Sequence, residues 1–127
     1  MRRQSKKLER LVEVHNKIIE SQFETIASLD ASLRDCDRQQ AQTLASMEQM
    51  ESMGLPKGPN YSRIFQEIHL RRGQLTKALL AAKAEHARVS AIVERLIERR
   101  SEIQSSIDQS DLEDSIDEWS NAQATFS

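Results

Sequence analysis

The chain has 127 residues, of which 30% are charged and only 4% are aromatic, and its mean hydropathy is −0.63. This composition excludes a thick globular core, although it leaves enough apolar residues for a seam between two helices. The formal net charge of −2 argues against a nucleic-acid binder, because the neutralisation of phosphates requires a basic surface.

An apolar heptad pattern predicts a first helix over residues of about 4–53. Its seam positions are Val12, Ile19, Ile26, Leu33, Gln40 and Met47 in one register and Leu8, His15, Gln22, Leu29, Cys36, Thr43 and Met50 in the other. Four further apolar residues widen the seam to one flank, namely Leu11, Ile18, Phe23 and Leu44. This face is broader than a two-stranded coiled coil requires, which indicates a further binding surface.

Residues 54–59, Gly-Leu-Pro-Lys-Gly-Pro, predict the turn that ends this helix. Pro56 and Pro59 lack an amide donor and disfavour the α conformation in the residue before them. Gly54 and Gly58 tolerate the positive φ at which helices end. We therefore expect the chain to reverse direction here and to form a long two-helix antiparallel coiled-coil hairpin, an all-α fold.

A second heptad pattern predicts a helix over residues of about 60–107, with Asn60 or Ser62 as its N-cap. Its seam positions are Phe65, Arg72, Leu79, His86, Val93, Arg100 and Ile107 in one register and Tyr61, Ile68, Leu75, Ala82, Val89, Leu96 and Ile103 in the other. Folding at the turn pairs residues whose numbers sum to about 112, which places Leu8 near Ile103 and Gln40 against Arg72. We interpret this polar pair as a register marker, because slipped alignments would set it against leucine.

A short acidic tail follows over residues 108–127, and the sequence predicts it to be partly helical or frayed. Leu112, Ile116 and Trp119 share one helical face among the acidic side chains. Two interpretations remain open. The tail either continues the second helix as a solvated end, or Trp119 folds back or docks on a partner.

No pattern indicates a catalytic, cofactor-binding or metal site, so we predict that the chain is not an enzyme. His15, His69 and His86 lack the i, i+4 spacing of a helical metal site. Cys36 falls on the seam, where we expect an inert core thiol. A single cysteine and the lack of a long apolar run are typical of a cytoplasmic protein with membrane contact that is at most peripheral, and recruitment to the inner face of the membrane stays open.

Residues 60–68, Asn-Tyr-Ser-Arg-Ile-Phe-Gln-Glu-Ile, begin an unbroken heptad pattern that continues to Arg99, Arg100 and Ile103. In this segment the chain resembles the FliJ/YscO family of small helical-hairpin proteins from flagellar and virulence type III secretion systems. The resemblance covers the length of the chain and both helices. It implies a stalk and chaperone component of the export apparatus that contacts a hexameric export ATPase and the export-gate membrane protein.

The resemblance also implies which residues make these contacts. The ATPase contact falls on basic residues where the two termini meet: Arg2, Arg3, Lys6, Lys7, Arg10, Arg95, Arg99 and Arg100. The export-gate contact falls on apolar residues just after the turn, Ile64 and Ile68. A basic surface of this kind suits the acidic interior of a ring.

A structural coiled-coil scaffold or helical chaperone is the alternative function. Such a protein would bind its partner through the apolar flank described above. Burial of this flank in a homodimer would favour the scaffold over the secretion stalk. A third class, a peripheral membrane-remodelling protein, would need the N-terminal arginine and lysine side chains for binding to lipids.

Overall fold

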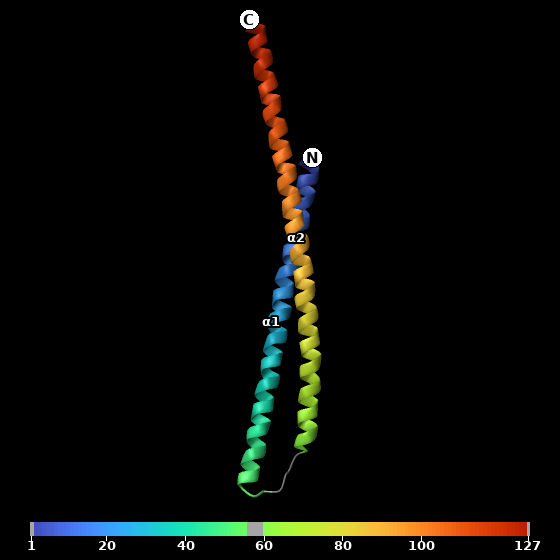
Figure 1. The fold of residues 1–127 in the computed structure, drawn as a ribbon, viewed down its shortest axis with the longest axis vertical. Helices are drawn as coiled ribbons and strands as arrows, with labels where there is room; N and C mark the ends of the chain where they lie inside the picture. Colours follow the sequence, from blue (N-terminus) through green and yellow to red (C-terminus); the bar gives the residue numbers. More distant parts are fainter. Residues whose placement is uncertain (1, 56–59, 127) are drawn as a thin grey trace. The chain divides into compact units, whose positions relative to one another are not determined.

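The computed structural model describes residues 2–55 and 60–126 of the chain, with side chains described as far as Ala124. Two helices make up this structure, α1 (Arg2–Ser52) and α2 (Tyr61–Phe126), as Figure 1 shows. The helices pack against each other, and the described ranges contain no strand. The predicted all-α helical hairpin is therefore confirmed.

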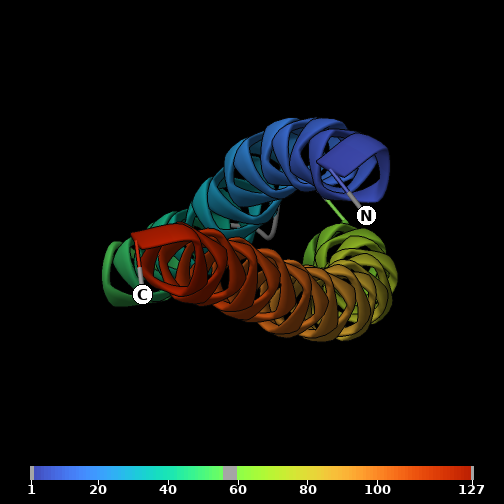
Figure 2. The same ribbon diagram turned by 90° about the horizontal axis from the view of Figure 1, so that it is seen from above.

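The chain divides into two compact units. The first unit comprises Met1–Ile19 and Arg88–Ser127, and the second comprises Glu20–Ala87. In each unit a part of α1 lies beside a part of α2 (Figure 1 and Figure 2).

The seam predicted from the heptad pattern holds the second unit together. Cys36 is fully buried, and Tyr61, Ile68 and Leu79 are each less than a tenth exposed. The other seam positions of this unit are partly buried, except for Gln40, which is exposed. Spacings of three and four residues thus give each helix one apolar stripe, and removal of the two stripes from water stabilises the pair.

The first unit uses the same seam. Its buried residues are Val89, Val93, Ile103 and Ile107 on α2, and its partly buried seam residues on α1 are Leu8, Val12, His15 and Ile19. The expected proximity of Leu8 and Ile103 is found, because both side chains line one groove. The heptad pattern therefore predicts the interface of this unit correctly.

The polar pair across the second unit differs from the expectation. Arg72 donates a hydrogen bond to Asp37, about one helical turn before the expected Gln40. A carboxylate binds a guanidinium more strongly than a neutral amide does, so Arg72 prefers Asp37. The pairing of Gln40 with Arg72 is therefore wrong, although Arg72 still makes a polar contact between the helices.

A C-cap at Gly54 ends α1. The φ of Gly54 is 68°, in the left-handed region that favours glycine. Its N–H donates to the carbonyl of Glu51, and the N–H of Leu55 donates to the carbonyl of Met50, each at 3.1 Å. These are the two bonds of a Schellman motif, which satisfies carbonyls that the helix end leaves unpaired. Residues 56–59 of the predicted turn lie outside the described residues.

Asn60 caps the start of α2. Its side-chain Oδ1 accepts a hydrogen bond from the N–H of Arg63 at 3.1 Å, and its carbonyl accepts one from the N–H of Ile64 at 3.2 Å. The hydroxyl of Tyr61 donates to the sulfur of Met50 at 2.9 Å and so joins the start of α2 to the last turns of α1. Asn60, one of the two expected caps, is therefore the cap that the chain uses.

The helix α2 extends well beyond the end predicted for it at about residue 107. The tail, predicted to be partly helical or frayed, is helical through Phe126, because the chain after Gly73 contains no glycine or proline to end the helix. Side-chain amides also bridge successive turns, from Gln104 to Asp108 and from Gln109 to Glu113. The tail therefore continues α2 and does not fold back, with Trp119 63% exposed, and docking of Trp119 on a partner stays a prediction.

Replacement of each of the two described glycines by alanine should change the stability of the second unit in opposite directions. Gly73→Ala should stabilise the second unit by about 1 kcal/mol, because Gly73 lies inside a helix with open space where a Cβ would be added. Gly54→Ala should destabilise the unit by about 1 kcal/mol, because alanine disfavours a positive φ even where space is open. Urea denaturation followed by circular dichroism measures both changes, and equal signs would contradict the prediction.

Two neighbouring leucines provide a matched test of the seam. Leu79 is 9% exposed and Leu80 is 64% exposed. Leu79→Asp should lower the free energy of unfolding by more than about 3 kcal/mol, because it buries an unpaired carboxylate, whereas Leu80→Asp should cost less than about 1 kcal/mol. Thermal melts of both variants provide the comparison. Similar melting temperatures for the two variants would mean that the seam is assigned incorrectly.

Candidate protein-binding site in the N-terminal segment

Five basic residues of the first turns of α1 form what we call the basic cluster: Arg2, Arg3, Lys6, Lys7 and Arg10. All five are exposed, and together they line one shallow hollow of the surface. Spacings of three, four and seven residues place them on one broad face of the helix. A helix start already carries a partial positive charge, so these bases reinforce the positive field there and do not stabilise the helix.

The basic cluster adjoins a groove between the two helices of the first unit. Leu8, Leu11 and Ile103 contribute apolar side chains to this groove. Lys7 and Arg99 contribute the positive charges, and Gln4 completes the lining. The structure thus brings together two predicted ATPase-contact residues, one from each helix, beside an apolar surface. A groove of this composition suits an acidic amphipathic segment.

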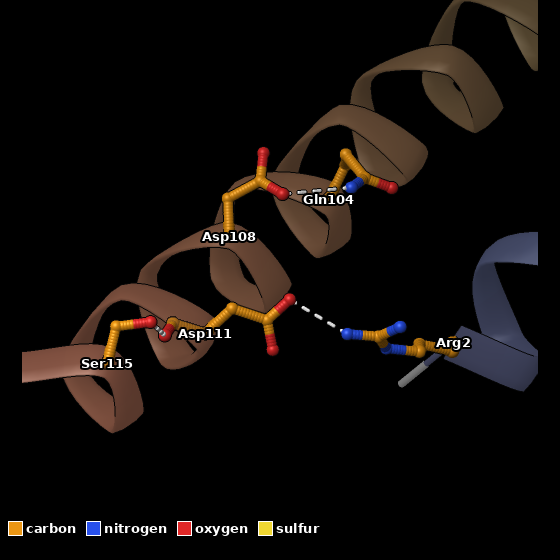
Figure 3. Close-up of polar contacts among 5 residues, drawn as sticks. All are labelled: Arg2, Gln104, Asp108, Asp111 and Ser115. Carbon is orange, nitrogen blue, oxygen red and sulfur yellow. Dashed lines mark hydrogen bonds and ion pairs between the residues drawn. The ribbon is translucent and has the colours of Figure 1, made fainter. Parts of the chain in front are cut away.

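Three of the predicted contact residues already have acidic partners within the first unit. Arg2 donates to Asp111 at 2.8 Å (Figure 3), and Arg100 donates to Glu9 at 2.8 Å. Arg99 pairs with Glu102 at 3.3 Å on its own helix. These side chains stay 43 to 73% exposed, so the pairs are screened by water and contribute little to stability.

The remaining predicted bases have no such partner among the described residues. Within residues 2–55 and 60–126, the structure gives no ion pair to the other members of the predicted ATPase contact, which are Arg3, Lys6, Lys7, Arg10 and Arg95. Arg95 lies one turn before Arg99 on α2 and is exposed. These cations are therefore available to acidic groups of another molecule.

The two predicted export-gate residues differ in their exposure. Ile68 is only 8% exposed, because it occupies a seam position in the second unit. Ile64 is partly buried and lines a shallow groove with Ile68 and polar residues of both helices, among them Gln39 and Arg71. Ile64 is therefore the more accessible of the two to a partner protein.

The predicted apolar flank is not a single surface. Leu11 and Ile18 each precede a seam position of one register, whereas Phe23 and Leu44 each follow a seam position of the other. In a coiled coil these positions lie on opposite sides of the seam, so the assignment of all four to one flank is wrong. Leu11 and Ile18 belong to the first unit, and Phe23 packs on His86 in the second, with ring centroids 4.6 Å apart.

The cysteine, the possible metal ligands and the hydropathy of the helices remain to be considered. Cys36 is a free, buried thiol of the seam, as predicted. Within the part of the chain that the structure describes, no group of three or more His, Cys, Asp or Glu side chains is arranged to hold a metal ion. Neither helix, over its described residues, has a stretch that is long and apolar enough to cross a membrane.

Comparisons with family models, curated proteins and solved structures found no match to this chain. The class of the protein therefore follows from its own fold and surface. It is an all-α helical hairpin whose N-terminal segment presents an exposed basic cluster beside an apolar groove.

Reversal of charge in the basic cluster should leave the fold intact. The triple variant Lys6→Glu, Lys7→Glu, Arg10→Glu should keep the helical content of the wild type, because these side chains are exposed and acids near a helix start interact favourably with the helix dipole. Far-ultraviolet circular dichroism measures the helical content. A large loss of helical signal at 25 °C would show that the cluster is structural.

Proposed function

We propose that this chain is a non-enzymatic stalk and chaperone component of a flagellar or type III secretion export apparatus. In this function the basic cluster, together with Arg95, Arg99 and Arg100, binds the acidic interior of a hexameric export ATPase. The chain acts in the cytoplasm, at the inner face of the membrane that holds the export gate. Ile64 and Ile68 belong to the contact with that gate.

The single observation that supports the ATPase contact most strongly is the unpaired positive charge of the basic cluster apart from Arg2, which pairs with Asp111. Its lysines and Arg10 are exposed, and the described residues provide no acidic partner for them. Their position at a helix start is electrostatically unfavourable for the helix itself. Charges of one sign on the first turns of a helix suit the recognition of an oppositely charged, concave partner.

A second candidate, a helical scaffold or chaperone, is supported by the exposed apolar residues. Leu11, Ile18 and Leu44 are 36 to 43% exposed, although they lie directly beside the seam. Apolar surface of this kind is typical of helices that bind a further amphipathic helix. This candidate requires only a helical partner and no ATPase.

The two candidates differ in the partner that the chain should recover. We expect the tagged full chain, incubated in moderate salt with lysate from its native source, to retain the hexameric export ATPase, which mass spectrometry identifies. The triple variant Lys6→Glu, Lys7→Glu, Arg10→Glu should retain at least tenfold less ATPase, since each lost charge pair at an interface weakens binding.

A matched variant tests whether the effect is specific to the site. Arg34→Glu, Lys77→Glu and Lys83→Glu together reverse three exposed bases of the second unit and change the net charge equally. This control should retain as much ATPase as the wild type. Equal losses in both triple variants, or recovery of a helical protein without any ATPase, would overturn the stalk and favour the scaffold.

A further inference from the structure

The end of α2 carries an apolar face that the described structure leaves open to solvent. Leu112, Ile116 and Trp119 form what we call the C-terminal stripe, and they are 61, 53 and 63% exposed. Their spacing of four and three residues places them on one side of the helix. Within the first unit, α2 continues past the start of α1, and Arg2 pairs with Asp111 just before the stripe begins (Figure 1 and Figure 3).

A second exposed apolar face lies on α1 in the same unit. Leu11, Val14 and Ile18 form the N-terminal stripe, with exposures of 36, 53 and 41%. Their spacing of three and four residues again places them on one side of the helix, over eight residues, the same length as the C-terminal stripe. Leu11 also borders the groove that Lys7 and Arg99 line.

The net charges around the two stripes are opposite in sign, with bases outnumbering the nearby acids Glu9 and Glu13 at the N-terminal stripe. The bases near the N-terminal stripe are Arg3, Lys7, Arg10 and Lys17, and the acids around the C-terminal stripe are Asp108, Asp111, Glu113, Asp114, Asp117 and Glu118. No base occurs among residues 108–127. Apolar faces of equal length with complementary charges are suited to packing against each other.

We propose that the C-terminal stripe of one chain docks on the N-terminal stripe of a second copy, and that the two chains form a reciprocal dimer. The contact cannot form within one chain, because α2 is a single continuous helix that carries the C-terminal stripe away from α1. A second copy supplies the complementary surface twice, so both stripes of both chains are covered. This is the self-complementary geometry of a two-fold symmetric interface.

Contacts inside the first unit allow an alignment of two copies to be tested against both stripes. Because Arg100 pairs with Glu9 and Arg2 pairs with Asp111, residues 11–18 of α1 lie beside residues of about 92–99 of α2. The two copies run in opposite directions, and their two-fold axis passes near residue 105 of α2. In this alignment Leu112 of each copy lies beside Leu11 of the other copy, and Trp119 of each lies beside Ile18 of the other. One symmetry axis therefore satisfies both docking contacts.

The opposite alignment is disfavoured by charge. Two copies that ran in the same direction would bring their C-terminal segments side by side. The acidic side chains from Asp108 to Glu118 of each copy would then face one another without any base between them. Repulsion between like charges selects the antiparallel alignment, in which acids face the bases of α1.

The only tryptophan of the chain reports this contact directly. We expect sedimentation equilibrium of the purified full chain to show a mass that rises from the 14.5 kDa of one chain to twice that value as concentration increases from about 1 µM to 1 mM. The emission of Trp119 should move to shorter wavelength over the same concentration range, because the indole leaves water. High salt should shift both transitions to higher concentration.

Variants of each stripe separate docking from folding. Leu11→Gln with Ile18→Gln, and separately Ile116→Gln, should each raise the dimer dissociation constant at least tenfold and keep the wild-type helical content. Leu80→Gln is the matched control, because Leu80 is 64% exposed in the second unit and belongs to neither stripe. It should leave the dissociation constant unchanged.

Three results would overturn the proposal. The first is a chain that stays monomeric up to 1 mM, which is the upper end of the expected range. The second is a dimer in which the Trp119 emission does not change, since the interface would then lie elsewhere. The third is a monomer whose Trp119 emission shifts only on addition of the export ATPase or of anionic vesicles, which would assign the C-terminal stripe to that partner.

Discussion

The burial of a narrow apolar seam within each of the two units is the interaction on which the structure depends. Every buried residue of the described chain, from Cys36 to Ile107, occupies one of the heptad positions that face the other helix. A core of this kind is one side chain deep on each helix. Because only the seam face of each helix is buried, most of the surface of each helix is free to bind other molecules.

Residues outside the seam therefore carry whatever specificity the chain has. The polar contacts between the helices, such as Arg72 with Asp37 and Arg100 with Glu9, lie at the edges of the seam and are largely exposed. They select the alignment of the helices more than they stabilise it, because exposed ion pairs contribute little free energy. In contrast, the bases without partners and the two apolar stripes make no evident contribution to the fold, which is why we assign them to binding.

The sequence predicts the fold well because the seam is a repeating signal. Each heptad adds independent evidence for the same two stripes, and only Gln40 among the seam positions is exposed. Gly54 and Asn60 were also predictable, since their caps depend on local backbone chemistry alone.

The end of α2 was harder to predict from the sequence, because an acidic, polar segment satisfies the compositional criteria for fraying. Its helix depends on the absence of breakers and on weak i, i+4 bridges, such as Gln109 with Glu113, which composition does not reveal. The assignment of Phe23 to the flank of Leu11 failed for a different reason. The side of the seam depends on whether a residue precedes or follows a seam position, and proximity to the seam does not determine it.

The candidate site follows only partly from the sequence. A cluster of bases at one end of the chain is visible in composition, but the pairing of Arg2 with Asp111 and of Arg100 with Glu9 depends on the folded helices. These pairs divide the predicted ATPase-contact residues into bases that already have partners and bases that do not. No residue pattern in the sequence makes that division, because it arises from contacts between distant segments.

The proposed contact with the ATPase and the proposed contact with a second copy both use residues in the first turns of α1. A second copy would cover Leu11 and engage Lys7, and these residues border the same groove as Arg99. An ATPase ring that bound the basic cluster would require the same lysine. Binding to the ring and binding to a second copy would therefore exclude each other, and each would lower the apparent affinity of the other by mass action. Because this dimer covers Leu11 and Ile18, its formation favours the scaffold, and the stalk requires that the dimer dissociate wherever the ring is present at sufficient concentration.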